Sequence, residues 1–199
     1  MTSTTDPMWH QLIAKIIKTR EDDHAFRARV SRGLVESTEH YAYPYVLPYA
    51  RDSREHRALL RAAAIAASHT KLRAAENDEL QPIGKTLAQM SFIRASEAGV
   101  RINADQPFPD PARPDVFSQR IASISQVPLD DAALAIDRLL TIGETLDRRP
   151  TVDYYRLTRT LLHWGNGISS ESLTMRRSIQ RDFYSGTGRH LTSTGTPES

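Results

Sequence analysis

Apolar residues recur at intervals of three and four along most of this 199-residue chain. That spacing places them on one face of an α-helix. The first such run has apolar residues at positions 9, 12, 13, 16 and 17. Outside one proline-rich stretch, apolar and polar residues never alternate over more than a few positions, as they would in a half-buried strand. The pattern predicts an all-α fold, a compact helical bundle of about eight or nine helices that forms one core or two lobes.

Proline content and apolar content divide the chain. Residues 99–114, "GVRINADQPFPDPARP", hold four prolines in sixteen residues, so they cannot form regular structure. They are predicted to be a loop joining lobes at about 6–98 and 114–184. The stretch 185–199 has almost no apolar residues and is predicted to be a disordered tail. We therefore expect a single helical domain over residues 6–184.

The composition excludes several kinds of chemistry. The chain has no cysteine, which removes disulfides, thiolate metal sites and cysteine nucleophiles together. It has no apolar run long enough to span a membrane and no secretory signal at its N-terminus, so we expect a cytoplasmic protein without membrane contact. The net charge is only +2. Such a small bulk charge does not indicate a nucleic-acid partner by itself, because phosphate binding depends on a local patch of cations.

No catalytic motif is complete. Gly84, Lys85 and Thr86 match the end of a phosphate-binding loop, but the full motif also needs a glycine at the position of Glu79. The seven histidines lack the short spacings that place two of them on one metal ion. No serine lies in a Gly-x-Ser-x-Gly sequence. We therefore expect no enzymatic activity, no metal and no cofactor.

Arginines recur at helical spacing on the polar side of several predicted helices. Residues at i, i+3 and i+7 share one side of a helix. Two predicted helices, at about 151–164 and from residue 53 onward, carry such a triplet opposite their apolar residues. The triplets are Arg156, Arg159 and His163 in the first helix, and Arg54, Arg57 and Arg61 in the second. For the first row, a solvated outer face and a phosphate-binding face are both open. Ile65 falls on the arginine side of the second helix, so that row is either partly covered or touches a partner.

Other arginines extend this pattern. In the helix predicted from about residue 23, Arg29 and Arg32 form an i, i+3 pair with Arg27 nearby. Arg120 differs because apolar residues flank it on its own face. It is either a core arginine paired with a buried carboxylate or one that emerges at a groove. Arginine strongly outnumbers lysine in these rows, which suits phosphate, since its planar fork can bond two oxygens at once.

Five segments follow one another along the chain: "FRARVSRG", "YAYPYVLPY", "HRALLRAAAIAAS", "YYRLTRTLLHWG" and "RRSIQRDFY". In this order and spacing they resemble the CasB family, the small subunits of the Cascade surveillance complex in type I-E CRISPR systems. The resemblance extends from about Trp9 to Tyr184.

The resemblance implies an all-helical protein without enzymatic activity, present in two copies. Its partners would be the backbone, large and crRNA-processing subunits of Cascade, together with crRNA and target DNA. The family binds single-stranded nucleic acid and supports the R-loop, in which guide RNA pairs with one DNA strand and the other is displaced. Arg29, Arg54 and Arg120 match the family's basic positions. Family members can carry basic residues after the Trp-Gly pair, whereas Trp164 and Gly165 precede "NGISSE", which argues against a strand contact at that turn.

We therefore expect the arginine rows to hold the sugar-phosphate backbone without reading base sequence. The alternative is a helical structural adaptor whose basic rows dock acidic protein partners. Charge reversal of Arg54, Arg57 and Arg61 is expected to leave the fold intact, because that row lies opposite the apolar stripe. Trp164, together with Trp9, Tyr154 and Tyr155, is expected to close a helical core rather than to stack on bases.

Overall fold

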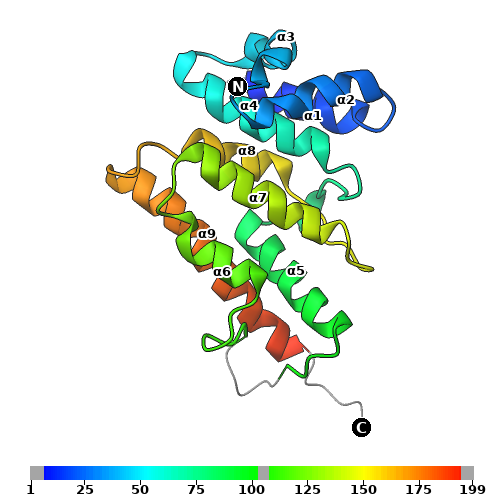
Figure 1. Ribbon diagram of the computed structural model, residues 1–199, viewed down its shortest axis with the longest axis vertical. Coiled ribbons are helices and arrows are strands. Elements are labelled where there is room, and N and C mark those ends of the chain that lie inside the picture. Colours follow the sequence, from blue (N-terminus) through cyan, green and yellow to red (C-terminus); the bar gives the residue numbers. More distant parts are fainter. Residues whose placement is uncertain (1–6, 103–107, 194–199) are drawn as a thin grey trace, which may run out of the picture.

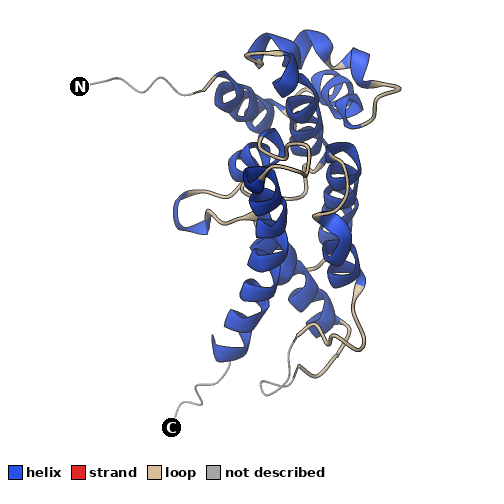
Figure 2. Ribbon diagram, turned by 90° about the vertical axis from the view of Figure 1, so that its left-hand side faces the viewer, coloured by secondary structure: helices blue, strands red, loops and turns tan. Residues whose placement is uncertain are grey.

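The structure is a computed structural model that describes residues 7–102 and 108–193, without the side chains of Arg54 and of residues 187–193. The described part contains nine α-helices and no strand (Figure 2), which confirms the predicted all-α fold. The helices are α1 (Met8–Thr19), α2 (His24–Ser31), α3 (Tyr43–Val46), α4 (Ser53–Ser68), α5 (Ile83–Glu97), α6 (Val116–Ile124), α7 (Leu129–Gly143), α8 (Tyr154–Leu162) and α9 (Ser170–Ser193). Short 3₁₀ turns are η1 (Arg32–Leu34), η2 (Glu39–Tyr41), η3 (Leu47–Tyr49) and η4 (Asn77–Glu79). Within the described ranges, no helix is both long and apolar enough to cross a membrane.

The helix α4 is the centre of one half of the molecule. Figure 1 shows α1, α2, α3 and α4 at one end, α7 and α8 across the middle, and α5, α6 and α9 at the other end. Every residue of α4 from 58 to 67 is buried, because α1, α2, α7 and α8 all pack against it. Its alanines lack bulky side chains, so these neighbours can approach closely. A helix surrounded in this way has little outer face.

The helices α5 and α9 pair closely at the other end (Figure 1). A Cβ atom added to Gly84 would lie 2.4 Å from the main-chain oxygen of Ile179, so glycine is what allows this approach. The match of Gly84 to a phosphate-binding loop is therefore a helix-packing feature. This pairing also crosses the loop at 99–114, which we expected to separate two lobes. Residues 99–102 and 108–114 of that loop contain no helix, and 103–107 lie outside the described residues.

The prediction of a disordered tail from residue 185 is wrong for residues 185–193, which continue α9. Gly186 is buried, and a Cβ atom there would lie 3.0 Å from the Cβ of Ala88 on α5. At Gly186 the helix therefore approaches α5 through its backbone, a contact that the low apolar content of the segment does not indicate. Residues 194–199 lie outside the described residues.

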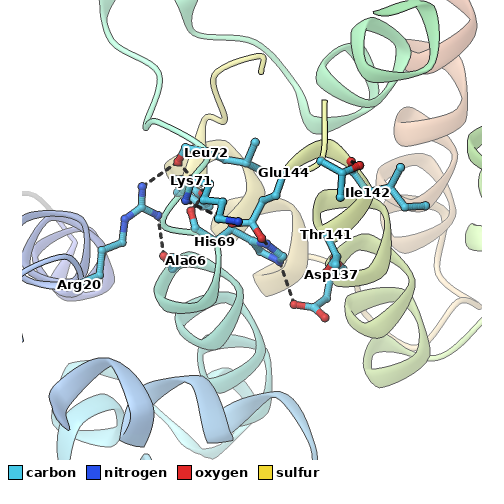
Figure 3. A network of polar contacts seen from close by, with 11 residues as sticks. Arg20, Ala66, His69, Lys71, Leu72, Asp137, Thr141, Ile142 and Glu144 are labelled. Atoms are coloured by element: carbon cyan, nitrogen blue, oxygen red, sulfur yellow. Dashed lines mark hydrogen bonds and ion pairs between the residues drawn. The ribbon is translucent and has the colours of Figure 1, made fainter. Parts of the chain in front are cut away.

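A buried polar network links the end of α1 to α4 and α7 (Figure 3). The Arg20 side chain is 2% exposed and donates hydrogen bonds to the main-chain oxygens of Ala66 (2.7 Å) and Leu72 (2.8 Å). Nearby, His69 Nε2 lies 3.0 Å from Asp137 Oδ1. Buried polar groups need such partners, because leaving them unpaired costs free energy. The network therefore fixes how α7 sits against the α4 end of the molecule.

Candidate nucleic-acid interface

The helix α8 separates a buried face from a basic face. Asp153 begins it, accepting a hydrogen bond from the main-chain nitrogen of Arg156 at 2.9 Å. Tyr154, Leu157 and Leu161 are buried against the core, whereas Arg156, Arg159 and His163 are exposed. The sequence-predicted row on α8 is thus an outer face in the folded protein.

Trp164 follows directly after α8 and points inward. It is 0% exposed, and its indole Nε1 donates to the main-chain oxygen of Val127 at 3.2 Å. The guanidinium of Arg176 lies 5.3 Å from the centre of the indole ring. The prediction that Trp164 belongs to the core is confirmed.

The basic face of α8 borders a groove of about 470 Å³ between α8, α1 and the segment before α4. Arg51 joins the α8 row from that segment. We call this feature the α1–α8 groove; it is lined by Pro7, Trp9, His10, Arg51, Tyr155, Arg156, Arg159 and His163. None of these described lining residues is acidic. The groove therefore gathers cations from segments far apart in the chain.

The arginines of the α1–α8 groove differ in how far they are neutralised. Arg51 bonds Glu55, with 2.9 Å between Arg51 Nε and Glu55 Oε1, and these hydrogen bonds lower the pKa of the Glu55 carboxyl. Arg156 Nε lies 3.3 Å from Asp153 Oδ2. Arg159 is exposed and has no ion-pair partner within the described ranges. Arg159 is therefore the groove cation with the most charge available to a ligand.

His163 can also serve a ligand in this groove. Its Nδ1 lies 2.8 Å from the main-chain oxygen of Arg159. A carbonyl oxygen only accepts hydrogen bonds, so this nitrogen carries the proton and Nε2 remains on the other side of the ring. Nε2 is therefore the ring nitrogen that is left to contact a ligand.

One wall of the groove is aromatic. The rings of His10 and Tyr155 stack with their centres 4.1 Å apart and their planes 24° from parallel. Trp9 contacts His10 edge-on at 5.6 Å. All three side chains are partly exposed. Arginine beside aromatic rings is a combination that recurs in proteins that bind single-stranded nucleic acid.

The α4 row differs from the α8 row, because the fold covers the part of it that contains Arg61. Arg61 is 0% exposed. Its Nη1 donates to the main-chain oxygen of Gly33 and to Glu39 Oε2, each at 2.6 Å, and its Nε donates to Asp130 Oδ1 at 2.7 Å. The η1 and η2 turns and the start of α7 cover this face of α4. In the isolated chain Arg61 is thus paired with groups inside the protein and presents no charge at the surface.

Arg57 lies between these extremes. Its side chain is 54% exposed and forms ion pairs with Glu36 at 3.5 Å and Asp130 at 3.4 Å. The side chain of Arg54 lies outside the described residues. The α4 triplet is therefore not one continuous exposed row.

Arg29 of α2 and Arg32 at the start of η1 each contact a tyrosine. Arg29 donates a hydrogen bond to the Tyr45 hydroxyl, and the guanidinium of Arg32 lies 4.4 Å from the ring centre of Tyr41. Arg29 and Arg32 are both exposed. Arg27 is half-buried and donates to the main-chain oxygen of Arg20 at 3.3 Å. Arg29 and Arg32 thus form a second basic patch at the surface, held by cation–π contacts.

Arg120 on α6 matches neither alternative fully. It is half-buried, and its buried Nε has no hydrogen-bond partner in the described part of the chain. Within that part, no carboxylate lies at ion-pair distance from it. Arg120 is therefore not a paired core arginine in this structure.

We expected Trp9 and Tyr155 in the core, but both are partly exposed and line the α1–α8 groove, as do His10 and Arg51. Tyr155 had a signal, because it precedes Arg159 by four residues and so shares its face. Trp9, His10 and Arg51 had none, since they come from other parts of the chain. Only the packing of α1 against α8 brings them to the row.

The family model for CRISPR-associated protein Cse2 matches residues 26–184. No curated protein matches. Solved structures of a CRISPR RNA-guided surveillance complex include chains that are 24% and 25% identical, with TM-scores of 0.63 and 0.65; each match covers 95% of this chain and 98% of the other.

A crystal structure of CasB from M. ruber has the same fold, at 17% identity and a TM-score of 0.58, over 94% of this chain and 98% of the other. CasB from Thermus thermophilus matches at 16% identity with a TM-score of 0.56, over 89% and 97% of the two chains. The resemblance that the sequence motifs indicated is confirmed. Because the family model spans most of its length, this chain belongs to the CRISPR-associated Cse2 family.

Proposed function

We propose that this chain is a non-catalytic subunit of a CRISPR RNA-guided surveillance complex and that it supports the R-loop by holding nucleic-acid backbone. Membership of the Cse2 family supports the first part, together with the likeness to chains of such complexes over nearly the whole length. This role places the protein in the cytoplasm with crRNA and target DNA. A second copy of the chain and the backbone, large and crRNA-processing subunits are its proposed protein partners.

The α1–α8 groove carries the nucleic-acid part of the proposal. Arg159 is exposed beside Arg51, Arg156 and His163, and none of the groove's described lining residues is acidic. Phosphate contacts of this kind position a strand without reading its sequence. R-loop formation exchanges one duplex for another of similar stability, so modest backbone contacts can shift the balance.

Other sequence-predicted arginines have secondary parts in this proposal. Arg29 and Arg32 form the second basic patch, and Arg57 retains an exposed side chain. Arg54 and Arg120 remain proposed nucleic-acid contacts because they match basic positions of the family that the sequence resembles. Arg27 is half-buried and Arg61 is wholly buried, so these two act on nucleic acid at most by supporting neighbouring residues.

The test is R-loop formation by the assembled complex with Arg159→Glu in this subunit. We expect weaker R-loop formation at moderate salt. If Arg159 binds one phosphate of a single strand, the substitution also reduces the slope of log affinity against log salt by about 0.7. Arg138→Glu is the matched control, because Arg138 is an arginine on α7 that is accessible and does not line the groove.

Two results would contradict the proposal. If Arg159→Glu and Arg138→Glu form R-loops equally well at low and high salt, the α8 row is only a solvated face. If Arg159→Glu instead prevents a partner subunit from co-purifying while free subunit folds normally, the row docks protein. The adaptor alternative has support in Arg57, which already bridges carboxylates of two other segments.

A further inference from the structure

The proposed backbone contacts do not account for the aromatic wall of the α1–α8 groove. Phosphate binding needs cations and hydrogen-bond donors, and Arg51, Arg156, Arg159 and His163 already supply them. The lining also includes the rings of Trp9, His10 and Tyr155, and Tyr155 is the ring nearest in sequence to the arginine row.

The position of Tyr155 links the two kinds of lining. It lies four residues before Arg159 on α8, so the two side chains share one face of the helix. Stacking against His10 of α1 holds the Tyr155 ring, with 4.1 Å between ring centres. An aromatic ring held in place loses little further freedom when a planar group stacks on it.

The size of the groove limits what can enter. Its volume of about 470 Å³ lies at the lower end of the range of about 300–1,000 Å³ that is typical of small-ligand sites. A paired base in a duplex keeps both faces stacked on its neighbours and cannot present one to a protein ring. A base that reaches the His10 and Tyr155 wall must therefore be unpaired.

We propose that the α1–α8 groove takes one unpaired nucleotide of a single strand, with its base against the His10–Tyr155 stack and its phosphate at Arg159. This inference rests on the proposed function and adds a base contact to it. The stack recognises the π-face that every base has, so the site binds any sequence. The strand is DNA or RNA, since both supply the same chemistry.

The test compares two single strands that carry the same number of phosphates: oligo-dT and an abasic strand of equal length. Full-length protein is titrated with each strand. We expect oligo-dT to bind at least about fivefold more tightly, the factor expected from one base–aromatic stacking contact. Oligo-rU is the RNA counterpart in this test. Equal affinity for rU and dT would mean that either nucleic acid can fill the groove. A difference in affinity would identify the preferred nucleic acid.

Two variants separate base contact from phosphate contact. Tyr155→Leu keeps an apolar side chain for packing, and it is expected to lower dT affinity to the abasic level while leaving abasic affinity unchanged. Arg159→Gln is expected to weaken both strands by the same factor. Tyr184→Leu is the matched control, because Tyr184 is a half-exposed tyrosine on α9 outside the groove, and its variant should retain the wild-type preference for dT.

A measurement on unmodified protein covers the case in which Tyr155→Leu fails to fold. Oligonucleotides carrying 5-iodouracil cross-link under ultraviolet light to aromatic side chains stacked on the base, and the cross-linked peptides should contain Tyr155 or His10. The inference is overturned if wild-type protein binds dT and abasic strands equally, if it binds neither, or if the cross-links lie outside α1 and α8. Equal binding of both strands, with a loss of R-loops in the Arg159→Glu complex, would leave the proposed backbone function standing.

Discussion

The arginine rows of α4 and α8 have the same spacing in the sequence and opposite surroundings in the structure. On α8, Arg159 is exposed at a groove without acidic lining among the described residues. On α4, Arg61 is fully buried and bonded to Glu39, Asp130 and a main-chain oxygen. Helical spacing therefore predicts which residues share a side, but not whether that side is covered.

The reason lies in the number of neighbours around each helix. α4 is packed by α1, α2, α7 and α8, and the η1 and η2 turns close over its arginine side. α8 packs on α4 and α1, and its arginine side is exposed. An arginine on a covered helix can remain only where carboxylates and carbonyls satisfy it, because an unpaired buried charge is strongly unfavourable.

The largest expected difference between the two rows is in folding stability. Arg61→Glu removes three hydrogen bonds and places a carboxylate beside Glu39 and Asp130. We expect it to lower the free energy of unfolding by at least about 3–5 kcal/mol, whereas Arg159→Glu should change it by less than about 0.5 kcal/mol. Thermal unfolding of both variants measures this. Because Arg61 is buried, we no longer expect charge reversal of the α4 row to leave the fold intact. Similar melting temperatures for both variants would contradict this revision.

The second prediction concerns the buried side of the α8 segment. Trp164→Ala empties a fully buried position and removes the hydrogen bond to Val127, so unfolding in urea should show a decrease of about 3–5 kcal/mol in stability. Oligonucleotide affinity per folded molecule should stay at the wild-type value, because Trp164 does not line the groove. His163→Ala is the control on the exposed side and should leave stability nearly unchanged. Normal stability of Trp164→Ala combined with weaker binding would mean that Trp164 contacts the strand.

Arg57 is neither fully buried like Arg61 nor free of ion pairs like Arg159 in the described part of the chain. Arg57→Glu breaks ion pairs to Glu36 and Asp130 and places like charges together at a site where the side chain is 54% exposed. Exposed pairs contribute little, so we expect a decrease of about 1 kcal/mol or less in the free energy of unfolding. The decrease should shrink as salt is raised. An effect as large as that of Arg61→Glu would show that the whole α4 row is structural.

The smallest expected effect concerns Glu55, which partly neutralises Arg51 in the groove. Hydrogen bonds from Arg51 lower the pKa of the Glu55 carboxyl. A lowered folded-state pKa contributes stability above the unfolded pKa of about 4.3, and this is lost as the pH falls through the folded-state value. As the pH falls through this range, the free energy of unfolding of Glu55→Gln should therefore decrease slightly less than that of the wild type.

The same Glu55→Gln variant should strengthen binding. Removing the carboxylate leaves more of the Arg51 charge for a phosphate, so oligonucleotide affinity at neutral pH should rise by less than about fivefold. Gln119→Ala is the control, because Gln119 is an exposed residue of α6 and its replacement changes no charge, so affinity should stay unaltered. Weaker binding by Glu55→Gln would mean that Glu55 is needed to orient Arg51 rather than to neutralise it.

Much of the fold could be predicted from local sequence, because the signals are local. Apolar spacing placed the main helices, and the buried position of Trp164 followed from its place after α8. The end of α9 could not be predicted, since the contact that Gly186 makes with Ala88 of α5 depends on a close approach of two distant helices. The pairing of α5 with α9 across the proline-rich loop depends in the same way on a close approach at Gly84.

The sequence by itself determined the helical class, the buried and polar sides of α8, the arginine spacing and the likeness to a CRISPR-associated family. Each of these follows from backbone periodicity or from the order of short motifs, which act over a few residues. Only the tertiary structure decided that Arg61 is internal and that Arg159 faces a groove with Arg51 and His10. The reason is that burial is set by which distant segments pack against a helix, and side chains far apart along the chain carry no mutual periodic signal.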